Sequence, residues 1–163
     1  MTAGASAKRG QSHVAPDIVF VGSSEVRGKV GKRQGVLLVV QFTNQGGDAV
    51  NVLAELLYDE QVSIARGHWF DRPSQSIWLR PHETAGVLVA LRTAEGGCLA
   101  FDDSRQPGIA YSVAEDAEQI EPIPLKATQR LRLVIKANNY HRRFEFDVDL
   151  NGDHMSCELS RTS

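Results

Sequence analysis

Apolar and polar residues alternate along much of the chain, and the clearest alternation lies in its C-terminal third. Leu131, Leu133 and Ile135 share one side of a period-two pattern, and Phe144 and Phe146 share one side of the next. A period of two residues is typical of a strand with two different faces, whereas a helix repeats every 3.6 residues. This part of the chain is therefore predicted to form two strands.

A two-residue turn at Asn138-Asn139 is predicted to join these strands, because asparagine tolerates the positive φ angles of a tight hairpin. Centring the turn there sets apolar residues opposite apolar ones and basic residues opposite acidic ones. Each such pair contributes roughly 0.2–1 kcal/mol, and a one-residue slip would break all of them. The predicted pairs are Leu133 with Phe144 and Leu131 with Phe146 on one face, and Arg132 with Glu145 and Arg130 with Asp147 on the other.

A second turn is predicted at Asn151-Gly152, since Asn-Gly is the strongest short hairpin signal. It completes a three-stranded meander over residues 129–159, in which the apolar side chains lie on one face. The predicted pairs are Val148 with Met155, Phe146 with Cys157, and Phe144 with Leu159.

Further strands are predicted upstream of the meander. Residues 36–44 are almost continuously apolar and β-branched, as expected for a central strand. Residues 49–58 fit a strand or a helix, and the two-glycine turn before them favours a strand. The basic, glycine-rich stretch 28–35 is predicted as a loop. Shorter or less regular strands are predicted to begin at Ile18, within 61–70, 77–81 and 85–91, and near 99–101 and 109–113.

The composition is that of an ordinary globular domain. The 163 residues are 42% hydrophobic and 23% charged, with a net charge of −2. This balance gives no overall attraction to nucleic acid, and no apolar run reaches the roughly 20 residues that would span a bilayer. Neither nucleic-acid binding nor membrane insertion is therefore predicted. Residues 1–14 are predicted as a disordered tail and 15–160 as one domain, in a cytoplasmic protein unless an upstream leader is missing.

The segment around Asn151-Gly152, from Asp147 to Glu158, also matches the sequence motif of a calcium-binding loop, D-x-D-x-N-G-x5-E. A helix-flanked calcium loop is not expected, because the residues before the turn have period two. The favoured interpretation is a solvated acidic hairpin without a cofactor. The alternative is a surface calcium site made by Asp147, Asp149, Asn151 and Asp153.

Residues 67–79, GHWFDRPSQSIWL, hold both tryptophans close to an arginine. Aromatic residues beside arginine in a turn-rich stretch are typical of a recognition surface. Trp69, Phe70 and Arg72 are therefore the candidate partner-binding residues. Trp78 lies between two aliphatic residues and is predicted to fill the core instead.

Other reactive or charged residues form no recognised catalytic pattern. The five histidines lack metal-binding spacing, and Cys98 and Cys157 are predicted to be free, buried thiols. The glycines between 22 and 30 do not match a phosphate-binding loop. Lys29, Lys32 and Arg33, and the basic run at 141–143, are interpreted as solvated, with phosphate contact as the alternative. The chain is accordingly predicted not to be an enzyme.

Three stretches resemble bacterial immunoglobulin-like modules: VLLVVQFTNQGGDAVNVLAEL, LRPHETAGVLVAL and the final meander. The second carries His82 where such turns usually have glycine, and the Cys-Trp-Cys signature of antibody domains is absent. The resemblance covers about half of the chain and implies an antiparallel immunoglobulin-like β-sandwich of about eight strands.

The expected function is therefore a non-catalytic protein–protein interaction module within a larger assembly, with self-association left open. The alternative is a carbohydrate- or calcium-dependent ligand-binding domain. A clear rise in melting temperature on adding calcium would favour that alternative, because a ligand that binds only the folded form stabilises it.

Overall fold

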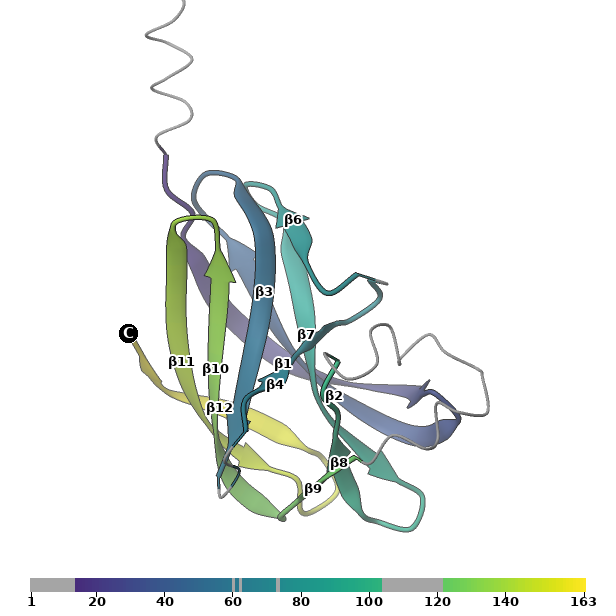
Figure 1. Cartoon of the computed structure of the whole chain (residues 1–163). Coiled ribbons are helices and arrows are strands. Elements are labelled where there is room, and N and C mark those ends of the chain that lie inside the picture. Colours follow the sequence, from purple (N-terminus) through teal and green to yellow (C-terminus); the bar gives the residue numbers. More distant parts are fainter. Residues whose placement is uncertain (1–13, 60, 62, 73, 104–121) are drawn as a thin grey trace, which may run out of the picture.

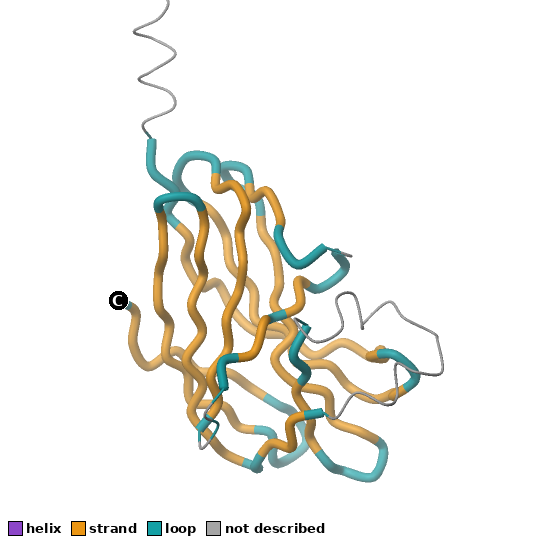
Figure 2. The backbone as a smooth tube through the Cα atoms, in the orientation of Figure 1, coloured by secondary structure: helices purple, strands orange, loops and turns teal. Residues whose placement is uncertain are grey.

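The chain folds as an antiparallel β-sandwich, which confirms the predicted all-β sandwich class, with twelve described strands rather than about eight. The structure is a computed structural model and describes residues 14–59, 61, 63–72, 74–103 and 122–163. Within these ranges the chain forms twelve strands, arranged as two six-stranded antiparallel sheets that pack against each other (Figures 1 and 2). The strand predicted near 109–113, and nearly all of the predicted tail, lie outside the described residues.

The two sheets take their strands from different parts of the chain. The first has the order β1 (Ile18–Val30), β2 (Arg33–Asn44), β7 (Thr84–Thr93), β8 (Cys98–Ala100) and β9 (Ile123–Leu125), with β5 (His68–Trp69) paired to β7. The second has the order β12 (Ser156–Thr162), β11 (Tyr140–Asp149), β10 (Thr128–Ala137), β3 (Ala49–Tyr58) and β4 (Ala65–Arg66), with β6 (Ile77–Leu79) paired to β3. Residues 49–58 thus form the strand that the turn chemistry favoured.

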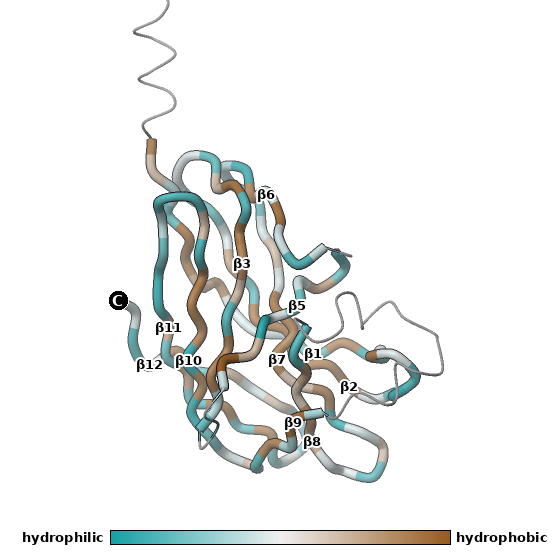
Figure 3. Tube along the Cα trace, in the orientation of Figure 1, coloured by the Kyte–Doolittle hydropathy of each residue, from teal (hydrophilic) through white to brown (hydrophobic). Residues whose placement is uncertain are grey.

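Apolar side chains from both sheets fill the space between them. Phe42 of the first sheet meets Phe144 of the second, with ring centroids 4.9 Å apart, and Phe20 meets Phe146 at 5.0 Å. Figure 3 shows apolar and polar positions alternating along the strands of both sheets. The period-two pattern of the sequence therefore becomes an inner and an outer face.

β2 is buried on both faces, as predicted for a central strand. Leu38 and Val40 belong to the main core between the sheets. Leu37 and Val39 belong to a second apolar cluster on the opposite face of the first sheet. The described members of this second cluster are Val30, Leu37, Val39, Leu88 and Leu91, with Phe70 and Phe101 packed against them.

The β10–β11 hairpin has the predicted register. Leu133 pairs with Phe144 and Leu131 with Phe146, while Arg132 pairs with Glu145 and Arg130 with Asp147. Asn139 in the turn has φ of 58°, the left-handed conformation that asparagine tolerates. Local turn chemistry and cross-strand pairing were sufficient to determine this hairpin.

The register predicted for the β11–β12 hairpin is wrong by two residues. Val148 pairs with Cys157 rather than Met155, and Phe146 pairs with Leu159. The connection is a loop from Leu150 to Met155 rather than a two-residue turn, because both of these end residues are buried in the main core. A shift of two preserves the faces, so the apolar side chains still point inward.

The loop predicted at 28–35 is also wrong. β1 pairs with β2 as far as Val30 and Arg33, and only Gly31 and Lys32 form the turn. Gly31 has φ of 60°, which glycine adopts without strain. Glycine content suggested a loop, but continuous pairing with β2 carries the strand through these residues.

The two tryptophans occupy the reverse of their predicted environments. Trp69 is fully buried in the main core, and its Nε1–H donates to the carbonyl of Val52 at 3.1 Å. Trp78 is 49% exposed, since the neighbouring residues on β6, Ile77 and Leu79, point inward. In a strand, the residue between two inward-facing residues must face outward.

Replacing these tryptophans should therefore have unequal effects on stability. Trp69→Ala should lower the free energy of unfolding by about 3–5 kcal/mol, because it leaves a large cavity in the core. Trp78→Ala should cost no more than about 1–2 kcal/mol, because it removes only the exposed stacking of Arg80 on the ring and the hydrogen bond from Nε1–H to the Asp48 carboxylate. Urea unfolding of both variants measures this. Equal losses would contradict the burial described above.

Candidate functional site

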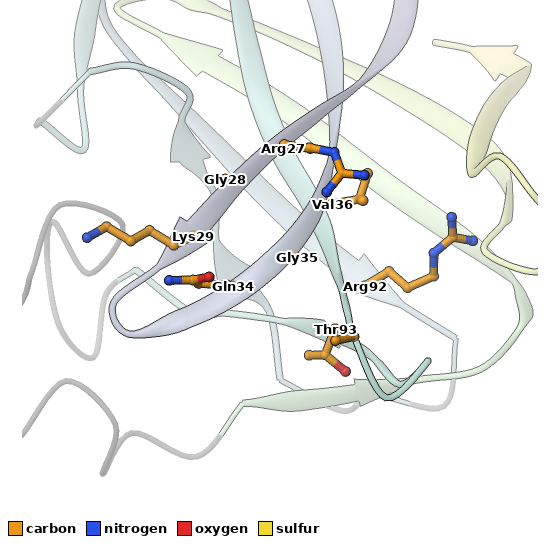
Figure 4. Close-up of a pocket in the computed structure, with 9 residues that line it drawn as sticks. Arg27, Gly28, Lys29, Gln34, Gly35, Val36, Arg92 and Thr93 are labelled. Atoms are coloured by element: carbon orange, nitrogen blue, oxygen red, sulfur yellow. The ribbon is translucent and has the colours of Figure 1, made fainter.

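A groove of about 590 Å³ opens beside the β1–β2 hairpin (Figure 4). It takes residues from three neighbouring strands of the first sheet and from the turn that follows β7. Its lining consists of Arg27, Gly28, Lys29, Gln34, Gly35, Val36, Arg92, Thr93 and Ala94. The strands therefore present a mixed surface of long cations, two polar side chains and a small apolar floor.

Two glycines belong to the lining of the groove. Gly28 and Gly35 are paired across the hairpin, so neither strand has a side chain at that row. Gly35 also pairs with Thr93, the last pair between β2 and β7, after which the two hairpins separate. A Cβ at Gly35 would overlap the carbonyl oxygen of Arg92. The close approach of β2 and β7 at the edge of the groove therefore requires glycine here.

Strand register places the cations of the groove together. Arg27 pairs with Val36, and Val36 pairs with Arg92, so the three residues form one row across β1, β2 and β7. Lys29 lies two residues along β1 and pairs with Gln34. Directly paired residues project from the same face of a sheet. The two arginines therefore flank Val36, with their backbones about 10 Å apart, two strand spacings.

The charge of this groove is not balanced by its own lining. The lining contains three cations and no acidic residue. The side chains of Arg27 and Lys29 are exposed, and neither makes an ion pair with any residue that the structure describes. Arg92 lies 3.8 Å from Glu25, whereas Arg27 and Lys29 have no such acid among the described residues, so a carboxylate bound beside them would gain a favourable interaction with both.

The outer face of the second sheet is organised differently. There Arg130 pairs with Asp147 at 3.6 Å, Arg132 with Glu145 at 3.7 Å, and Lys136 with Glu55 at 2.8 Å. Each of these cations lies beside an acid of a neighbouring strand. Acids on neighbouring strands thus compensate these three cations, whereas no described acid forms an ion pair with Arg27 or Lys29.

Arg92 ties the β11–β12 loop to one side of the groove. Its guanidinium donates to the carbonyl of Gly152 at 2.8 Å and to that of Asp153 at 3.1 Å, and lies 3.8 Å from a carboxylate oxygen of Glu25. The same carboxylate is 2.8 Å from Nδ1 of His154. The loop singled out as a calcium candidate is therefore held through its backbone carbonyls and by His154.

Several groups act on the Glu25 carboxyl. Desolvation pushes its pKa upward, but hydrogen bonds from His154 and the Met155 backbone, with the charges of His154 and Arg92, outweigh that effect. The pKa of Glu25 therefore lies below its ordinary value. The charged form of Glu25 is stabilised by the fold.

The candidate calcium ligands lie along β11 and within this loop. Asp147 and Asp149 are exposed on the strand, and Asn151 and Asp153 are exposed in the loop. The Asp149 carboxylate accepts a hydrogen bond from the Asn151 backbone at 2.9 Å. In the described ranges, no three His, Cys, Asp or Glu side chains gather as a metal-binding group. Strands rather than helices flank the loop, as predicted.

The three residues predicted as a partner-binding surface do not form an exposed patch. Trp69 is buried, so its predicted exposure was wrong. Phe70 is half-buried against the second apolar cluster. Arg72 is half-buried and lies 3.3 Å from Glu83. Trp69 ends β5 and is buried in the core, whereas Phe70 and Arg72 lie in the turn and loop that follow the strand.

The sequence indicated only part of the groove. Lys29 belonged to the basic stretch that was noted as a phosphate contact, but Lys32 and Arg33 of that stretch do not line the groove. Arg27 and Arg92 were not singled out, because they lie far apart in sequence and meet only through their pairing with β2. The sequence feature that marks this region is the pair of glycines at 28 and 35, both in the lining of the groove, although they suggested a loop rather than two paired strands.

Both cysteines are free thiols. Burial raises the pKa of Cys157 to about 12. Cys98 is half-buried rather than buried; desolvation raises its pKa, and the charge of Arg92 only partly opposes this. Both thiols are thus held in their protonated, weakly nucleophilic form.

Comparison of this chain with protein family models, curated proteins and solved structures gave no match. Among the described residues, no helix is long and apolar enough to cross a membrane.

Glu25 should make stability depend on pH on the acid side. Because its folded pKa is depressed, its contribution is fully present above the unfolded value of 4.5 and is lost as the pH falls through the folded pKa. Glu25→Gln should therefore be less stable than the wild type at pH 7, and the difference should shrink at about pH 3. Urea unfolding at both pH values measures it.

His154→Ala supplies the control, because it removes the strongest favourable contact of Glu25. On that background the pH-dependent effect of Glu25→Gln should be smaller. A difference between wild type and Glu25→Gln that is the same at both pH values would contradict the role assigned to this carboxylate.

Proposed function

We propose that this chain is a non-catalytic interaction module that binds an acidic segment of a partner protein in the groove beside the β1–β2 hairpin. The observation that carries the proposal is the pair Arg27 and Lys29, two cations on one face of β1 without a compensating acid among the described residues; Arg92, which lies beside Glu25, is in the same row as Arg27. Protein carboxylates are suited to such a row because arginine binds them through paired hydrogen bonds.

The contrast between the two sheets supports a binding role. On the second sheet, cross-strand acids neutralise Arg130, Arg132 and Lys136, which is what solubility and strand pairing require. Arg27 and Lys29 lack such acids among the described residues, in a chain whose net charge is −2. A local basic surface on a slightly acidic protein concentrates acidic partners at one place.

The apolar component of the groove supports a peptide as the ligand. Val36 lies between the two arginines, and Ala94 lies at the edge of the groove. The methylene groups of the acidic side chains would contact this floor while their carboxylates meet the cations. Arg92 is already positioned by two loop carbonyls, so it would lose little conformational freedom on binding.

Binding of a fluorescently labelled glutamate-rich peptide, followed by anisotropy, tests the proposal. The affinity of the full chain should fall at least about tenfold in Arg27→Glu/Lys29→Glu, because opposed charges are replaced by like ones. It should also fall as the NaCl concentration rises, since the cations are solvent-accessible.

Arg143→Glu is the matched control. To match the double change it is combined with Arg161→Glu: both are exposed strand arginines of the second sheet, outside the groove, and together they make the same change in net charge as the groove variant. Equal loss of binding in this control and in the groove variant would show non-specific charge attraction and would overturn the proposal, as would a peptide that fails to bind the wild type.

A further inference from the structure

We infer that the acidic segment binds as an added β-strand on the free edge of β1, with acidic residues at alternate positions opposite Arg27 and Lys29. This inference rests on the proposed function and specifies the conformation and sequence pattern of the partner. The partner would be an extended segment containing acid-x-acid, rather than any acidic chain.

β1 is the outermost strand of the first sheet, and its edge is covered only in part. The backbone of Ile18 donates to the Tyr140 hydroxyl at 3.0 Å, and the hydroxyl of Ser23 accepts from the Cys157 backbone at 3.4 Å. Glu25 then contacts His154. Beyond Glu25, the structure describes no strand paired to this edge, so residues 26–30 offer it to a partner.

The turn geometry determines which backbone groups face outward. Val30 and Arg33 flank a two-residue turn, and such flanking residues exchange both backbone hydrogen bonds. In an antiparallel ladder, hydrogen-bonded pairs alternate with pairs that are not bonded to each other. Gly28 therefore bonds to β2 as Val30 does, whereas the N–H and C=O groups of Arg27 and Lys29 point away from it.

The outward backbone groups and the unbalanced cations thus belong to the same two residues. A strand added antiparallel would bond to Arg27 and Lys29, and the two residues directly opposite them would lie two positions apart, about 6.8 Å. Their side chains would project to the same face as the two cations. Carboxylates at these positions would complete the cross-strand pairing that the second sheet already shows.

The residue between the two acids would project to the other face, beside Gly28. On that face the Leu37 side chain reaches over Gly28, with its Cδ1 2.9 Å from where a Cβ at Gly28 would lie, so an apolar residue at this position would contact Leu37. Arg27 and Lys29 also discourage the edge from pairing with a second β1, because like charges would then face each other. The same two side chains therefore reject self-pairing and select an acidic strand.

Two peptides of identical composition and charge test the spacing. One carries Glu-Val-Glu and the other Glu-Glu-Val, in otherwise the same flanks. The alternating peptide should bind the full chain at least about fivefold more tightly, because only it sets both carboxylates opposite the cations. Equal affinities would overturn the added-strand inference while leaving the proposed acidic-peptide binding intact; no binding of either would overturn both.

Backbone methylation gives an independent readout. In the bound alternating peptide, the amides of the two glutamates point toward β1, and the amide of the central valine points away. N-methylation of either glutamate should abolish binding, whereas N-methylation of the valine should leave the affinity within about twofold. Tolerance of methylation at the glutamates would show side-chain capture without strand addition.

Amide hydrogen exchange of the protein locates the new hydrogen bonds. On binding, the amides of Arg27 and Lys29 should become protected, while that of Gly28, already bonded to β2, should change little. The charge-reversed Arg27→Glu/Lys29→Glu variant should bind Lys-Val-Lys in place of Glu-Val-Glu, with folding checked by its melting temperature. Protection elsewhere but not at these two amides would contradict the inference.

Discussion

Pairing register in the first sheet is the constraint on which the candidate site depends. A two-residue turn at Gly31 and Lys32 aligns β1 with β2, and the pairing of β2 with β7 brings Arg92 into the same row as Arg27. Neither arginine needs to recognise the other for this to happen. The main chain places them, and the apolar burial of β2 on both faces holds that main chain in position.

The same constraint produces opposite electrostatic results in the two sheets. In the second sheet, register aligns basic with acidic side chains, and the face is largely neutralised by its own strands. In the first sheet, register aligns Arg27 with Arg92 across Val36 and supplies no acid to the lining. The protein therefore has a net charge close to zero and still presents a concentrated basic groove. Net charge alone gives no indication of such a site.

Loops near the groove are part of its construction. Arg92 binds carbonyls of the β11–β12 loop, and His154 of that loop meets Glu25 of β1. These contacts join the second sheet to the first at the place where the groove opens. They also hold the segment that matches the calcium-loop pattern, whose ends, Leu150 and Met155, are buried in the main core and whose carbonyls at Gly152 and Asp153 bind Arg92.

The sequence by itself determined the all-β fold class, the inward sides of β10 and β11 and the register of the β10–β11 hairpin, because alternation and turn chemistry act between near neighbours. It did not decide how far β1 and β2 extend, since glycines at 28 and 35 suit a loop as well as a strand. It also did not decide which tryptophan is buried: Trp69 and Trp78 have similar neighbours, and only the pairing of β5 with β7 and of β6 with β3 gives each its face. Only the tertiary structure forms the groove. Arg27 and Arg92 are far apart in the sequence, and both line the groove because β1 and β7 pair with opposite edges of β2.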